Sequence, residues 1–308
     1  MSRSGLWAIG GGLLNIIMLL VLAPFLQGVS RKLTARIQSR QGPPLWQPYF
    51  DLLKLLGKED IESGEAPAMQ RFAAYLSLAI VLTVACLVPM GFSTRMDGIG
   101  DIILLIYLLT VSGVCTLLAG LAAGSTYSLV GISREMMTMI SLEPLLVIAL
   151  VTGAVHAHSL RLDNVLNGAV YARDAFPWSG LLMLIVMLLS FQAFAQRIPF
   201  DISEAETELM EGPLMEYSGP KLALFKYAQM AKLVVYAALF VAMFVPFGAN
   251  LPFPLSWLLF WVKVVVMVIL VTLVAATHAR YRIDQAIRFF AGLIAVALGS
   301  LVLASYGY

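Results

Sequence analysis

Residues 252–276 read PFPLSWLLFWVKVVVMVILVTLVAA, an apolar run in which Lys263 is the only charged residue. A transmembrane helix requires about 20 predominantly apolar residues, so this stretch is long enough to cross a bilayer. The run is continuous and does not alternate apolar with polar residues, which excludes a strand of a transmembrane β-barrel. The stretch therefore predicts a membrane-spanning helix.

Seven further apolar runs of similar length extend over residues 6–29, 72–94, 101–123, 136–159, 177–196, 221–247 and 286–305. The chain of 308 residues is 60% hydrophobic and 12% charged, with a net charge of +2. Soluble domains carry roughly 45–50% apolar and about 25% charged residues. This composition excludes a soluble, disordered or nucleic-acid-binding protein. It predicts one all-α, polytopic membrane domain of about eight transmembrane helices.

The loops between these runs differ in basic charge. The loops at 30–71, 124–135, 197–220 and 277–285 together hold 11 lysines and arginines, whereas the opposite side holds four. Loops rich in lysine and arginine stay in the cytoplasm. We therefore expect these four loops to be cytoplasmic and both termini to lie on the outer face.

The first of these loops contains an amphipathic segment. Residues 40–58 read RQGPPLWQPYFDLLKLLGK, and the Gly-Pro-Pro stretch cannot be helical. Beyond it, Asp51, Lys54 and Lys58 fall on one face of a helix, and apolar residues fill the rest. This pattern predicts a helix that lies along the membrane surface. It serves either as a simple anchor or as a cavity wall or docking surface.

The loop at 197–220 is acidic, and residues 201–216 read DISEAETELMEGPLME. If the middle of the loop is helical, one face of this helix carries an acidic stripe formed by Asp201, Glu204, Glu208 and Glu211. Glu206 then points away from the stripe. The stripe is either solvated, with Asp201 and Glu204 as a capping box, or a carboxylate row that exchanges protons or faces a basic partner. Residues 30–58 have a net charge of +5 and residues 197–220 of −5, so the two loops are natural electrostatic partners.

Glu143 lies inside the fourth apolar run and is followed by Pro144, which predicts a kinked helix. A charge in the bilayer centre costs at least about 2.5–3.5 kcal/mol and commonly marks a functional group. A neutral Glu143 that hydrogen-bonds a neighbouring helix is the alternative. The other ionisable residues within the runs are Lys226, which can snorkel, Lys232 and Lys263. Arg134 and Glu135, just before the fourth run, can pair with each other.

Several motifs extend along nearly the whole chain. They are Arg40-x-Gly42-Pro43 with Gln47, Asp51 and Lys54-Leu55-Leu56; Gly131-x-x-Arg134; Ile140-Ser141-x-Glu143; Arg197-x-Pro199-Phe200-Asp201; and Glu216-Tyr217-Ser218-Gly219. With these motifs the chain resembles the complex I membrane subunit at the heel of the membrane arm, the subunit 1 family. It resembles more closely the relatives of that subunit in membrane-bound group 4 nickel–iron hydrogenases, including formate hydrogenlyase. The hydrogenase branch is favoured by Ser133-Arg134-Glu135, by Ser141-Leu142-Glu143-Pro144 and by Glu211-Gly212-Pro213-Leu214.

The resemblance implies a subunit in the cytoplasmic membrane of a prokaryote that is not catalytic alone and binds no metal or cofactor. It would anchor a soluble redox arm and couple electron transfer to proton or sodium translocation. Implied partners are the hydrogenase large and small subunits, which would hold iron–sulfur clusters and a nickel–iron centre, and antiporter-like membrane subunits. The alternatives are a quinone-site subunit of a complex I-like NADH dehydrogenase and, less favoured without an internal repeat, a free-standing transporter.

The resemblance also assigns residues to two roles. Docking of the soluble arm is assigned to Arg36, Arg40, Gly42, Pro43, Gln47, Asp51, Lys54, Arg134 and Arg197. Proton relay or coupling is assigned to Glu143, Asp201, Glu204, Glu206, Glu208, Glu211, Glu216, Lys232 and Lys263. Phe194 stands where many relatives carry a carboxylate, so the resemblance implies a shorter or differently routed path through Glu143 and the acidic loop.

Overall fold

The structure is a computed structural model. It describes residues 3–61, 66–92, 100–168, 170–171, 178–203, 206–210, 212–248 and 251–307, without the side chains of residues 3–9 and 206–207. Its elements are α1 (Arg3–Ile37), α2 (Gln47–Leu56), α3 (Pro67–Leu87), α4 (Ile102–Ala123), α5 (Thr126–Ala157), α6 (Leu162–Val165), α7 (Trp178–Phe194), α8 (Glu206–Leu209), η1 (Gly212–Leu214), α9 (Gly219–Phe244), α10 (Leu255–Thr277) and α11 (Ile283–Ser305).

Seven helices in the described part of the chain are long and apolar enough to cross a membrane: α1, α3, α4, α5, α9, α10 and α11. The eighth apolar helix, α7, has 17 residues and rises about 26 Å, slightly less than the roughly 30 Å of a hydrocarbon core. Helices suit this environment because every backbone group is satisfied within the segment. The prediction of an all-α polytopic membrane protein is confirmed.

α5 begins earlier than its apolar run. Gly124 ends α4 with a positive φ of 69°, and Ser125 caps α5 by accepting the Ser128 N–H at 3.2 Å. Most of the predicted loop at 124–135 is therefore helix, and Arg134 and Glu135 lie on it. Hydropathy does not reveal this segment because its residues are too polar to extend the apolar run.

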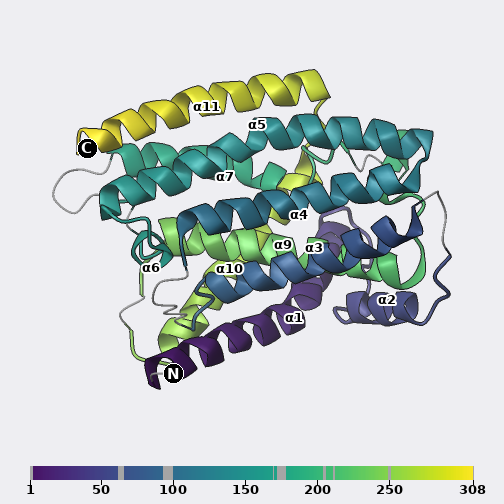
Figure 1. The fold of residues 1–308 in the computed structure, drawn as a ribbon, viewed down its shortest axis with the longest axis horizontal. Coiled ribbons are helices and arrows are strands. Elements are labelled where there is room, and N and C mark those ends of the chain that lie inside the picture. Colours follow the sequence, from purple (N-terminus) through teal and green to yellow (C-terminus); the bar gives the residue numbers. More distant parts are fainter. Residues whose placement is uncertain are drawn as a thin grey trace.

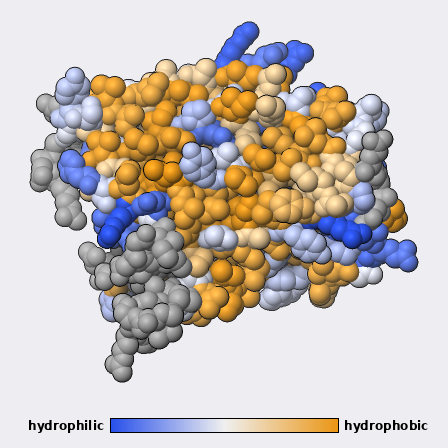
Figure 2. Space-filling model, in the orientation of Figure 1, coloured by the Kyte–Doolittle hydropathy of each residue, from blue (hydrophilic) through white to orange (hydrophobic). Residues whose placement is uncertain are grey.

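The long helices form one bundle in which both chain ends lie at one end and α2 lies at the other (Figure 1). We call the second end the Arg40 end; it gathers residues 38–61, 195–203, 206–210, 212–218 and 278–282. Hydrogen bonds join these segments: the Tyr281 N–H donates to the backbone oxygen of Pro199 at 2.9 Å, and the Ile61 N–H donates to the side-chain oxygen of Ser218 at 3.2 Å. Figure 2 shows that hydrophobic residues cover most of the face in view and hydrophilic residues gather mainly at its margins.

α9 forms the centre of the bundle. Its most apolar window is 78% buried, the highest share among the seven candidate spans. Two lysines lie on this helix at buried positions, Lys221 at 3% exposure and Lys232 at 9%. Buried ammonium groups require nearby acceptors or anions, so polar groups must enter the bundle beside α9.

Gly28 lets the chain after α1 pack closely against that helix. A Cβ at this position would overlap the backbone carbonyl of Leu45, whereas a Cβ at Gly292 on α11 meets nothing within 4 Å. We expect Gly28→Ala to lower the free energy of unfolding by about 1–3 kcal/mol through overpacking. Gly292→Ala is the matched control. Thermal unfolding of the two purified variants in detergent measures the difference, and equal midpoints would contradict the close approach.

Candidate functional site

The predicted amphipathic helix is present as α2, preceded by non-helical backbone at residues 41–44. Leu52 is buried, and the outward face exposes Trp46, Phe50, Leu53 and Leu56. The helix ends at Leu56, so Lys58 lies beyond it and does not share its polar face. The exposed apolar residues leave α2 suited to contact lipid or a partner protein.

Asp51 fixes α2 to α1. Arg31 Nη1 donates to Asp51 Oδ2 at 2.7 Å, and Gln47 Nε2 donates to Asp51 Oδ1 at 3.0 Å. Burial alone would raise the pKa of Asp51, but the hydrogen bonds from Arg31 and Gln47 and the positive charges of Arg31 and Lys54 lower it overall. Asp51 is therefore engaged within the chain and holds α2 against α1.

The Arg31–Asp51 pair predicts a pH dependence. Because the folded pKa of Asp51 is lowered, its stabilisation is present above the ordinary value of 3.8 and is lost as the pH falls through the folded pKa. Both side chains are more than a third exposed, so we expect Arg31→Gln to weaken α2 by about 0.2–1 kcal/mol at neutral pH. Hydrogen exchange of residues 47–56 measures this, with Lys32→Gln as control. A difference that persisted well below pH 3.8 would contradict the ion pair.

The predicted acidic stripe on one helix is wrong. α8 has only four residues, and the chain turns at Met210 and Gly212, which have positive φ values of 58° and 56°. Asp201 precedes α8 in non-helical backbone and pairs with Arg280 at 3.1 Å, while Glu208 pairs with Arg134 at 2.6 Å. The hydrogen bond from Arg134 lowers the pKa of Glu208. Glu204, Glu211 and the side chain of Glu206 lie outside the described residues.

A cavity of about 720 Å³ opens at the Arg40 end, between α1, α9, α10 and the segments around them. Its lining brings together residues of both predicted roles: Arg40, Gly42, Pro43, Arg197, Asp201 and Lys232. Arg197 Nη2 donates to Gln27 Oε1 at 2.5 Å across the cavity wall. The volume falls within the roughly 300–1,000 Å³ of small-molecule sites.

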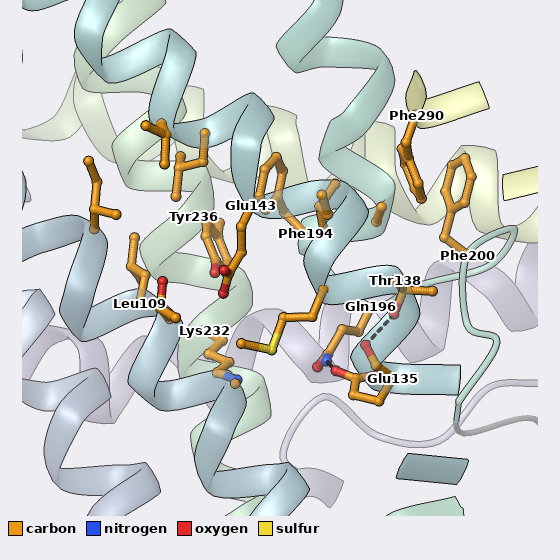
Figure 3. Close-up of a pocket in the computed structure, with 18 residues that line it drawn as sticks. Leu109, Glu135, Thr138, Glu143, Phe194, Gln196, Phe200, Lys232, Tyr236 and Phe290 are labelled. Carbon is orange, nitrogen blue, oxygen red and sulfur yellow. Dashed lines mark hydrogen bonds between the residues drawn. The ribbon is translucent and has the colours of Figure 1, made fainter. Parts of the chain in front are cut away.

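A second cavity of about 80 Å³ lies within the bundle and contains Glu143 (Figure 3). The hydroxyl group of Thr110 hydrogen-bonds the Glu143 carboxyl group, and Tyr236 lies beside it. Glu135 lines the same cavity two turns earlier on α5. A single water requires about 10–15 Å³ of such volume, so this cavity is large enough for water.

Three residues line both cavities and form the partition between them: Phe194, Gln196 and Lys232. Gln196 follows α7 with a positive φ of 50°, and its Nε2 donates to Glu135 Oε1 at 2.7 Å. Lys232 Nζ lies 3.4 Å from the carbonyl oxygen of Ser112. The partition therefore consists of one apolar side chain, Phe194, and two polar ones, Gln196 and Lys232.

Other predicted residues lie elsewhere. Lys263 Nζ donates to the carbonyls of Val245, at 2.8 Å, and Phe247, so it caps the end of α9 away from the Arg40 end. Arg36 and Lys54 are exposed at the Arg40 end, and Glu216 is half-buried after η1.

Glu135 is a site residue that was not predicted from the sequence. It is only 8% exposed, and Arg134 pairs with Glu208 instead of with it. Ser203 Oγ donates to Glu135 Oε2 at 2.5 Å. The available signal was its spacing of eight residues from Glu143, which allows both carboxyl groups to meet one cavity on a helix.

Known proteins with similar sequences are subunits of membrane complexes. The chain is 37% identical to hydrogenase-4 component C of Escherichia coli over 272 residues, which cover 87% of this chain and 85% of the relative. It is 32% identical to formate hydrogenlyase subunit 4 of the same organism, covering 88% and 91%. NADH-quinone oxidoreductase subunit 8 of Thermus thermophilus is 32% identical, with coverage of 92% and 81%.

A sequence profile described as NADH dehydrogenase matches residues 11–305. The chain belongs to the NADH dehydrogenase subunit 1 family. A subunit in the structure of a membrane-bound sulfane sulfur reductase, an archaeal respiratory membrane complex, superposes with a TM-score of 0.86 at 25% identity and covers 97% of this chain and 99% of that one. Membership of this family makes the chain a multi-pass membrane protein whose relatives work inside larger complexes.

Proposed function

We propose that this family member is the membrane subunit of a hydrogenase complex of the hydrogenase-4 or formate hydrogenlyase type. It anchors a soluble redox arm and couples electron transfer to movement of protons or sodium ions. The supporting observation is the pair of cavities: one opens at the Arg40 end among the predicted docking residues, and the other contains Glu143 inside the bundle. Their shared partition gives charge changes at the docking end a route to a membrane carboxylate.

The proposal includes partners and a location. Hydrogenase large and small subunits carrying the nickel–iron centre and iron–sulfur clusters would sit at the Arg40 end, and antiporter-like subunits would lie beside the bundle in the membrane. The protein would reside in the cytoplasmic membrane of a prokaryote with the Arg40 end inside and both termini outside. The excess of lysine and arginine in the loops of that end supports this orientation.

Purification of the native complex through a tag on this chain tests the function. We expect nickel and iron to co-purify, and we expect inverted membrane vesicles to evolve hydrogen while an ion gradient forms. Recovery of an NADH-oxidising arm without nickel would contradict the hydrogenase assignment.

A quinone-site subunit of a complex I-like NADH dehydrogenase is the second candidate, because the 720 Å³ cavity is large enough for a small amphipathic molecule. Quinone reduction by the purified complex distinguishes the two functions. Under the hydrogenase proposal, added quinone accepts no electrons.

A further inference from the structure

Six of the described carboxylates at the Arg40 end and in the bundle differ in the kind of group that holds them. Four are held by cations: Asp51 by Arg31, Asp60 by Lys221, Asp201 by Arg280 and Glu208 by Arg134. Among the described residues, Glu135 and Glu143 have no cationic side chain within ion-pairing distance and are held by neutral groups. The first four are therefore engaged by a neighbouring positive charge, whereas Glu135 and Glu143 have neutral partners.

The partners of Glu135 suit either protonation state. In the structure, both Gln196 and Ser203 donate to its two oxygens, the arrangement of a charged carboxylate. An amide can turn to offer its oxygen, and a hydroxyl group can rotate to accept. A protonated Glu135 would therefore also find an acceptor in place. A site that satisfies both states is what a proton carrier requires.

The position of Glu135 indicates a proton route from the large cavity to the small one. Its partner Gln196 belongs to the partition and also lines the large cavity, whereas Glu135 lines the small cavity that contains Glu143. In Figure 3 Glu135 and Gln196 lie together on one side of this cavity, and Glu143 and Tyr236 lie further along it. Asp201, which the resemblance assigns to proton relay or coupling, lines the large cavity and is paired with Arg280.

We propose that Glu135 is the proton-exchanging group that connects the large cavity to Glu143, with Gln196 and Ser203 as its switchable partners. This inference rests on the proposed ion-coupling function. A proton from water in the large cavity neutralises the Glu135 carboxylate. The neutral acid then passes the proton through water in the small cavity to Glu143 and regains its negative charge. No electron moves, and no bond other than O–H is formed or broken.

Charged and titratable groups on the surrounding elements set the equilibrium between the charged and the protonated form of Glu135. Positive groups favour charged Glu135, and negative groups favour its protonation. These groups are Arg134 and Glu143 on α5, Arg197 after α7, Asp201 and Glu208 in the acidic loop, Lys232 and Tyr236 on α9, and Arg280 after α10. Redox change in a soluble arm at the Arg40 end would act through the same electrostatics.

The test uses the intact complex in inverted vesicles with Glu135→Gln, Glu135→Asp and Glu143→Gln. Asp284→Asn, an exposed carboxylate at the Arg40 end, is the control. Ion movement per electron is measured beside an infrared pH titration of protonated carboxyl groups. For Glu135→Gln we expect assembly, loss of one titrating carboxyl band and a fall in ion movement of about 10²-fold or more. Glu135→Asp should recover part of both signals.

Four outcomes overturn the inference. Full ion movement in Glu135→Gln, together with loss in Glu143→Gln, removes Glu135 from the path but leaves the proposed function intact. Full movement in both variants rejects the proposed function itself. An unchanged carboxyl titration in Glu135→Gln assigns Glu135 a structural role. A loss of ion movement in Asp284→Asn equal to that in Glu135→Gln does the same.

Discussion

Replacing Glu143 by glutamine is expected to abolish ion movement and leave the complex assembled. Glutamine has nearly the same shape and keeps an oxygen for the Thr110 hydroxyl group, so the small cavity should survive. It cannot take up a proton, and removal of a positioned proton carrier costs roughly 10²–10⁴-fold in rate. Electron transfer by the soluble arm should continue without building a gradient.

The measurement for Glu143→Gln is gradient formation in inverted vesicles during hydrogen evolution, with proton and sodium indicators used in parallel. Glu143→Asp should retain part of the activity because it keeps a titratable group. Asp101→Asn is the matched control: its carboxylate is exposed at the opposite end and makes no capping hydrogen bond to α4. If Glu143→Gln vesicles form a normal gradient, the relay role of Glu143 is wrong.

Hydropathy and loop charge predicted much of the fold, because the bilayer imposes one rule on every span. A run such as 252–276 has few alternatives to a helix, and α10 occupies most of it. The turn at Gly42-Pro43-Pro44 and the helix after it also follow from local rules, since proline fixes φ and lacks the N–H that a helix needs.

The acidic loop and Glu135 escaped prediction for different physical reasons. Helical periodicity was applied to residues 201–211, but the chain adopts positive φ at Met210, and no local pattern required that turn. Glu135 obtains its environment from Gln196 and Ser203, which lie 61 and 68 residues away in the sequence. Contacts of such separation depend on how the helices pack, and periodicity within one segment does not report them.

The structure also changes how docking should be tested. Asp51 is paired with Arg31 inside the chain, so replacing it by alanine would loosen α2 and weaken attachment of the soluble arm only indirectly. Arg36 and Arg40 are exposed at the same end, and Arg40 lines the large cavity. These two arginines are the direct test of an electrostatic docking surface.

We expect the double variant Arg36→Glu and Arg40→Glu to release the soluble arm under salt conditions that the unaltered complex withstands. Reversing two charges replaces attraction to an acidic partner by repulsion, and like charges facing each other across an interface cost several kcal/mol. Salt weakens the remaining attraction because exposed charges are screened over roughly 8 Å at physiological ionic strength. The hydrogenase activity found in the supernatant after graded salt washes measures the release.

Arg161→Glu provides the control for this release, because Arg161 is exposed at the end where the chain termini lie. It reverses a charge away from the proposed docking surface and should leave the arm attached. The exposed apolar face of α2 beside the arginines would retain part of the contact, so release should be graded with salt and not complete in its absence. An arm that stays bound to the double variant through every wash would show that docking does not depend on these charges. The apolar face of α2 would then be the surface to replace next.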